Sequence, residues 1–211
     1  MRHKLLGDES LSIRGRVVAL ALTTLISIGL VGVTAVPAHA DTFERFGSVT
    51  RSEFIAGAQS VGGLTKKQAS SAWSDESLRW QIPVSTTDEK VTESGGFSAL
   101  STSKTHSFNR KFISGLGIEL LNMFVTQTFS YDGSRAYLGS TSVLPWTNPV
   151  TEWSYTGITQ QQDYYLDAPY GRAMSERTGT WRFDPPGYLN SVMVTMEGRY
   201  NGISNAWGSQ F

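Results

Sequence analysis

The sequence holds few side chains suited to nucleophilic or acid–base chemistry. Among 211 residues it has no cysteine and three histidines, of which His3 and His39 fall in a leader-like N-terminal segment. A Ser-His-Asp triad would have to use His106, in the alternating polar stretch Ser103–Phe108, and no Gly-x-Ser-x-Gly elbow surrounds any serine. We expect His106 to be an exposed strand residue and do not expect a serine hydrolase.

The same scarcity limits metal chemistry. A catalytic zinc site usually takes two or three His, or His with Cys, and the chain beyond the leader offers a single imidazole. A carboxylate site for a hard cation such as calcium is the metal option left open, yet no acidic loop of the EF-hand pattern is present. We therefore expect no metal and no cofactor. Without cysteine there are no disulfides, so stability must come from packing or a bound ion.

Glycoside hydrolysis remains possible because it needs only two carboxylates on either side of a sugar, with aromatic platforms nearby. Glu152 beside Trp153, and Asp184 after Trp181, are the pairs that the sequence offers. They would have to face one cleft with their carboxyl groups about 5 to 9.5 Å apart. Some carboxylates fall beside tryptophan by chance, so a small glycosidase is the third interpretation, behind two that involve no catalysis.

The stretch Gln160–Tyr170 is richest in groups that bind sugars. We interpret it as a polar connection between two strands, in which tyrosine rings stack on sugars and carboxylates accept hydrogen bonds from hydroxyls. The rings could equally insert at a membrane interface or fold back over a sheet edge. The predicted ligand-binding residues are Trp153, Tyr164, Tyr165, Tyr170, Asp163 and Asp167.

One segment, Phe112–Val125, has the pattern expected of a membrane-active hairpin. It is apolar, and Gly115 and Gly117 make it pliable. A buried central strand with a glycine bend gives the same pattern. Rapid hydrogen exchange in this segment would favour detachment from the fold, and full protection would count against it.

Two helices are expected ahead of the strands. Thr50 and Glu53 form a capping box before an apolar face that ends at Gly62-Gly63, and Thr65 with Gln68 repeats the pattern. These helices would either dock onto a partner or cap one end of a sheet.

From Leu78 onward the hydrophobic period is two, which predicts strands, and Asp132-Gly133 predicts a tight hairpin turn. Thr86–Gly96 reads as a mobile loop. The fold class is mainly β, an antiparallel sandwich or open barrel with a short N-terminal two-helix cap. Further strands are expected at Leu78–Val84, Leu121–Tyr131, Glu152–Ile158, Arg172–Glu176, Thr178–Phe183 and Ser191–Tyr200.

The first forty residues have the layout of a secretory signal peptide. Basic residues precede an apolar run, Val17–Val36, and Ala38-His39-Ala40 suits signal peptidase, so cleavage is expected between Ala40 and Asp41. The alternative is an uncleaved membrane anchor through the same run. The expected organisation is therefore a signal peptide (1–40), a helical cap (41–77) and a β-sandwich (78–211), in a protein exported by a bacterium of the Gram-positive type.

Charge argues against nucleic acid as a partner. Loss of residues 1–40 removes four of 18 basic and two of 18 acidic residues, which leaves 14 against 16. A net charge of about −2, without a basic cluster, does not neutralise phosphates. All 24 aromatic residues lie beyond residue 40. They fill a core or form a binding face.

The region Trp153–Trp207 resembles, in general appearance, small exported β-rich proteins of Gram-positive bacteria, including lactococcin-type bacteriocins. No motif aligns, so the resemblance assigns no residue a role and serves only to keep a toxin hypothesis open. The expected function is binding of a glycan or cell-wall ligand at the cell surface or in the medium, without catalysis. The alternative is an antibacterial or membrane-active protein whose partner is a membrane surface.

Overall fold

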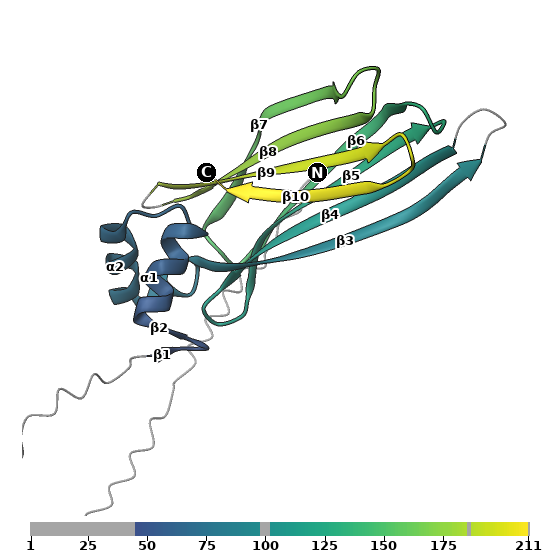
Figure 1. Ribbon diagram of the computed structural model, residues 1–211. Helices are drawn as coiled ribbons and strands as arrows, with labels where there is room; N and C mark the ends of the chain where they lie inside the picture. The colour runs from purple at the N-terminus through teal and green to yellow at the C-terminus, as the bar shows by residue number, and fades with distance from the viewer. Residues whose placement is uncertain (1–44, 98–101, 185–186, 211) are drawn as a thin grey trace, which may run out of the picture. The chain divides into compact units, whose positions relative to one another are not determined.

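Two four-stranded antiparallel sheets, packed face to face, make up most of the computed structural model (Figure 1), which describes residues 45–97, 102–184 and 187–210. The predicted signal peptide, its cleavage site between Ala40 and Asp41 and the apolar run Val17–Val36 lie outside these residues. The first sheet contains β3 (Pro83–Phe97), β4 (Thr102–Ser114), β5 (Glu119–Tyr131) and β6 (Ala136–Thr147). The second contains β7 (Trp153–Leu166), β8 (Arg172–Phe183), β9 (Tyr188–Arg199) and β10 (Ser204–Gln210).

Both sheets are simple meanders. Their strand orders are β3-β4-β5-β6 and β10-β9-β8-β7, so every strand pairs with a neighbour in sequence. The predicted antiparallel β-sandwich is thereby confirmed. The predicted Asp132-Gly133 turn also joins β5 to β6 as expected, with Gly133 at φ +86° and the Asp132 carboxylate accepting from the backbone N–H of Ser134 at 2.8 Å.

The N-terminal helices form where the capping boxes predict. A small ribbon, β1 (Arg45–Phe46) and β2 (Val49–Thr50), leads into α1 (Arg51–Ser60), and α2 (Lys66–Ser74) and α3 (Glu76–Arg79) follow. Thr50 caps α1 with its side chain while its backbone N–H donates to the Glu53 carboxylate at 2.7 Å, and Thr65 and Gln68 repeat this arrangement. The rings of Phe54 and Trp73 pack edge to face at 5.3 Å, which holds α1 against α2.

The core lies between the sheets. Phe112 of β4 meets Trp181 of β8 at a ring separation of 6.3 Å. Gly198 of β9 leaves room for Phe129 of β5, because a Cβ at this glycine would lie 2.4 Å from the ring. Large rings therefore fill the sandwich, as one of the two interpretations of the aromatic content predicted.

Several predicted strand limits are wrong. Thr86–Gly96 is not a loop. It forms most of β3, an edge strand whose charged and polar residues give it a composition typical of loops. Its Asp88 pairs with Arg110 of β4 at 2.7 Å. Residues 78–82 are not a strand, since Leu78 lies in α3. The two strands predicted in 172–183 are one, β8, and β10 was not predicted.

The connection predicted at Gln160–Tyr170 is also mostly strand. β7 continues to Leu166, and the turn takes only residues 167–171. Glutamine and tyrosine are compatible with an exposed edge strand, which is where β7 lies in the second sheet.

Candidate functional site

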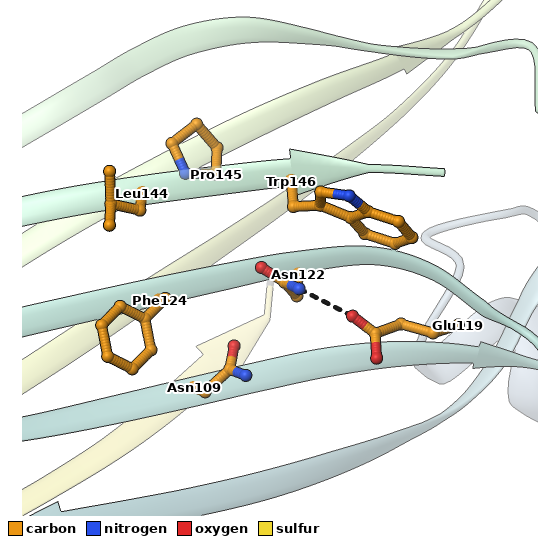
Figure 2. Close-up of a pocket in the computed structure, with 7 residues that line it drawn as sticks. All are labelled: Asn109, Glu119, Asn122, Phe124, Leu144, Pro145 and Trp146. Carbon is orange, nitrogen blue, oxygen red and sulfur yellow. Dashed lines mark hydrogen bonds between the residues drawn. The ribbon is translucent and has the colours of Figure 1, made fainter. Parts of the chain in front are cut away.

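A hollow of about 530 Å³ lies on the outer face of the first sheet, the face turned away from the second sheet (Figure 2). Three adjacent strands, β4, β5 and β6, supply its lining, so the hollow is built on regular backbone. The lining residues are Asn109, Glu119, Asn122, Phe124, Leu144, Pro145 and Trp146.

Strand register explains why most of these side chains meet. Alternate residues of a strand point to opposite faces, and Phe108, Phe112, Met123 and Val125 point into the core. The residues between them face outward. Across the sheet they form two rows, one of Lys111, Asn122 and Trp146 and the other of Asn109, Phe124 and Leu144, each member paired with the next.

The apolar part of the hollow is open to solvent. The side chain of Trp146 is 41 % exposed and that of Leu144 is 63 % exposed, while Phe124 is half-buried. An indole ring on a rigid strand loses little conformational freedom when a flat ligand stacks on it. This arrangement suits a ligand with an apolar face.

The polar part is an ordered set of amides and charges. The Asn122 amide donates to the Glu119 carboxylate at 2.6 Å (Figure 2). The Lys111 ammonium donates to Glu89 of β3 at 2.6 Å and lies 3.9 Å from Glu119. The hydrogen bond from Lys111 lowers the pKa of Glu89, and the same bond raises the pKa of Lys111.

One atom of the hollow has no hydrogen-bond partner. The side-chain oxygen of Asn109 is buried and accepts no hydrogen bond within the part of the chain that the structure describes. An unsatisfied buried acceptor costs about 1–3 kcal/mol. Because this oxygen has almost no solvent-accessible surface, a ligand donor can reach it only if the Asn109 side chain turns.

The chemical capacity of the hollow is for binding. Its lining supplies no histidine or hydroxyl, and Glu119 is held by Asn122. Among residues 45–97, 102–184 and 187–210, no three His, Asp or Glu side chains gather to hold a metal ion. What the hollow offers is an exposed ring beside hydrogen-bonding amides and a carboxylate.

Among the ligand-binding residues predicted from the sequence, Trp153 is the most deeply buried. Its side chain is 4 % exposed, its indole N–H donates to the carbonyl of Gln81 at 2.7 Å, and its ring packs on Phe183 at 5.1 Å. Trp153 is part of the core and is not placed for stacking on a ligand.

Tyr164 and Asp163 are committed to partners on β8. The Tyr164 hydroxyl donates to Glu176 at 2.8 Å, and burial together with this carboxylate raises the pKa of Tyr164 to about 12. Asp163, on the opposite face of β7, pairs with the buried Arg177 at 2.7 Å, and hydrogen bonding from Arg177 lowers the pKa of Asp163. These two side chains hold β7 to β8.

Tyr165, Tyr170 and Asp167 do come together at the far end of β7. They line a second hollow of about 370 Å³ with Ala168 and Pro169. The two tyrosine rings meet edge to face at 5.0 Å, and the Tyr165 hydroxyl accepts from the backbone N–H of Leu138 at 3.2 Å. Asp167 is paired with Arg172 at 2.8 Å. The Tyr165 hydroxyl and the Asp167 carboxylate of this hollow are therefore already paired within the protein.

His106 is not the exposed residue that we predicted. It is 3 % exposed, its Nε2 lies 2.8 Å from the Gln127 side-chain oxygen, and its ring packs against Phe129 at 5.5 Å. Burial lowers the pKa of His106. It shares the inward face of β4 with Phe108, which is the period-two signal that places it inside.

The two carboxylates proposed for a glycosidase are neighbours in the fold. The backbone N–H of Asp184 donates to the carbonyl of Glu152 at 3.3 Å, and both residues are exposed. The Asp184 carboxylate is paired with Arg182 at 2.6 Å. Neither residue lines either of the two hollows described above.

The segment Phe112–Val125 forms the turn between β4 and β5, the two inner strands of the first sheet. Leu120, Leu121 and Met123 are fully buried. Gly117 has φ +78°, which a turn of this kind requires. The segment therefore has the arrangement of the buried central strand with a glycine bend.

The residues of the first hollow were not predicted from the sequence. Asn109, Asn122 and Phe124 alternate with core residues, which is a signal for an outward face, but only the register across three strands shows that they meet Trp146.

Comparison of the chain with models of protein families, with curated proteins and with solved structures finds no match. Within the described residues, no helix is long and apolar enough to cross a membrane.

Proposed function

We propose that the protein is exported and binds a glycan, such as a cell-wall polysaccharide, through the hollow around Trp146. The observation that carries the proposal is an exposed indole ring, that of Trp146, beside the outward-facing amide of Asn122 and the carboxylate of Glu119. Glycans offer both complements, because a sugar ring has an apolar face that stacks on indole and hydroxyl groups that donate to amide oxygens.

The hollow supports this ligand class better than the residues we predicted from the sequence. Trp153, Tyr164 and Asp163 use their polar groups to hold the fold together. In the hollow, by contrast, ring and amide stand outward on rigid strands. Preorganised groups of this kind bind with little ordering cost.

The experiment is a pulldown with insoluble cell-wall preparations and polysaccharides, using the wild-type protein and Trp146→Ala. Trp207→Ala is the matched control, since Trp207 is exposed to a similar degree, 43 % against 41 %, but lies on the second sheet. We expect Trp146→Ala to abolish retention and Trp207→Ala to retain it, with both variants folded. Equal retention by wild type and Trp146→Ala would refute the hollow as the binding site.

A second candidate function, contact with a membrane surface, is favoured by a group of exposed apolar residues next to the hollow. Leu116 and Ile118 of the β4–β5 turn are 46 % and 36 % exposed, and Val150 after β6 is 71 % exposed. Hydrogen bonds from Asn148 to Leu120 and Glu119 hold the two connections at one end of the sheet. Co-sedimentation with lipid vesicles, lost in a Leu116→Ser/Val150→Ser variant, would support it.

A further inference from the structure

Apart from the indole N–H of Trp146, the polar atoms of the hollow that make no hydrogen bond to a described residue are acceptors. The Asn109 oxygen is buried without a donor, and the Asn122 oxygen has no hydrogen bond to a described residue. The second oxygen of Glu119 is 3.9 Å from the Lys111 ammonium, beyond hydrogen-bonding distance. A ligand that matches these three oxygens must bring donors.

Two of the donors at the hollow already make hydrogen bonds within the protein. The Asn122 amide nitrogen donates to Glu119 at 2.6 Å, and the Lys111 ammonium donates to Glu89 at 2.6 Å. The hydrogen bond from Lys111, with a smaller contribution from the Asn109 side chain, lowers the pKa of the Glu89 carboxyl. Figure 2 shows the Asn109 oxygen turned toward Asn122.

The charge at this place is negative. Glu89 and Glu119 lie on either side of the single ammonium of Lys111, so the group carries a net charge of about −1 at neutral pH. The exposed face of Trp146 also attracts cations, since the ring quadrupole is negative above and below its plane. Charge and ring therefore favour the same kind of ligand.

We propose that the hollow selects glycans bearing free amino groups, such as glucosamine oligomers, over their N-acetylated and acidic counterparts. This rests on the proposed function. An ammonium group has three donors, a positive charge and no acceptor, which complements the Glu119 carboxylate and the Asn122 amide oxygen. Acetylation removes the charge and adds a carbonyl acceptor, and a uronate adds a negative charge beside Glu119.

Isothermal titration of the purified protein with the tetramers of glucosamine, N-acetylglucosamine and galacturonic acid tests the inference. A charged hydrogen bond is stronger than a neutral one by an amount that corresponds to about tenfold in affinity. We expect glucosamine tetramer to bind about tenfold more tightly than the acetylated tetramer, and the uronate to bind most weakly.

Two variants and a control locate the effect. Glu119→Gln should reduce the tenfold preference to near unity while acetylated tetramer still binds, and Trp146→Ala should weaken both ligands. Asp184→Asn, which removes an exposed carboxylate at a distant ion pair, should leave the preference unchanged. A preference that survives Glu119→Gln, or that Asp184→Asn reduces as much as Glu119→Gln does, would reduce it to non-specific charge attraction and overturn the inference.

The two proposals fail in different ways. Equal affinity for glucosamine and N-acetylglucosamine tetramers, both dependent on Trp146, overturns selection for amino groups and leaves glycan binding intact. If Trp146→Ala does not change the binding of any oligosaccharide or cell-wall preparation, the glycan-binding function itself is overturned.

Discussion

The hollow on the first sheet and the tyrosine-rich end of β7 contain similar kinds of side chain, but their polar groups differ in what they already bind. Asp163, Tyr164 and Asp167 are each joined to a charged partner within 2.8 Å. In the hollow, the buried oxygen of Asn109 has no partner in the described residues. Aromatic and acidic composition alone therefore does not distinguish a binding site from a structural network.

The largest expected effect is the difference in the free energy of unfolding between alanine variants of two tryptophans seven positions apart. Trp153→Ala removes a core ring and its hydrogen bond to Gln81, so we expect a loss of about 3–5 kcal/mol in the free energy of unfolding. Trp146→Ala should cost less than about 1 kcal/mol because its ring is 41 % exposed. Urea denaturation followed by circular dichroism measures both. Similar losses would mean that Trp146 has a structural role after all.

A second comparison concerns two carboxylates. Asp163→Ala leaves the guanidinium of Arg177, only 5 % exposed, without its bidentate partner. We expect a cost of about 2 kcal/mol, below that of a fully buried pair because Asp163 itself is 45 % exposed. Glu119→Gln should leave the melting temperature unchanged. If the Asp163 variant were as stable as wild type, β7 would not depend on this pair.

Buried His106 should make the stability of the protein depend on pH. Burial lowers the pKa of His106 below 6.5, although the hydrogen bond to Gln127 acts in the opposite direction. Between 6.5 and the lower folded-state pKa, the unfolded chain takes up a proton that the folded chain does not. Stability should therefore fall as the pH drops through that interval, with a slope of at most about 1.4 kcal/mol per pH unit.

The measurement is urea denaturation between about pH 5 and pH 7. Comparison with His106→Gln removes the background from other groups, because this variant should lose the slope over that interval. A wild-type slope retained in the variant would assign the effect to carboxylates.

The smallest effect is expected at Asn109. Asn109→Ala removes a buried acceptor that has no partner among the described residues, and this gain offsets the side-chain contacts that are lost, so the unfolding free energy should stay the same or rise by up to about 1 kcal/mol. Binding of glucosamine tetramer should nevertheless weaken severalfold. A large loss of stability would instead identify the hydrogen bond to Glu89 as the main role of this residue.

Local signals in the sequence were sufficient for α1, α2 and the hairpin at Asp132-Gly133, because capping boxes and turns are decided by residues within a few positions; α3 was not predicted. The sandwich followed from the spacing of period-two segments. β3 was not recognised, because its acidic and basic residues are matched by Arg110 and Lys111 on β4, a pairing that appears only once the register is known.

The hollow could not be predicted for the same reason. Trp146 and Asn109 are thirty-seven positions apart and lie on strands that do not touch each other; β5 lies between them. The prediction for His106 was wrong for a different reason. Its spacing from Phe108 and Phe112 indicates the inward face of β4, whereas the prediction of an exposed residue followed from its polar side chain.

The pairing of every strand with its neighbour in sequence has a consequence for how the protein folds. The first sheet uses only residues 83–147 and the second only 153–210, so each can form by successive hairpins as the chain becomes available from its N-terminus. Short loops close with little entropic cost, and pairing between sequence neighbours keeps the contact order low for a β-sandwich. Folding should therefore be fast for this class, with docking of the two completed meanders as the step that requires distant residues to meet.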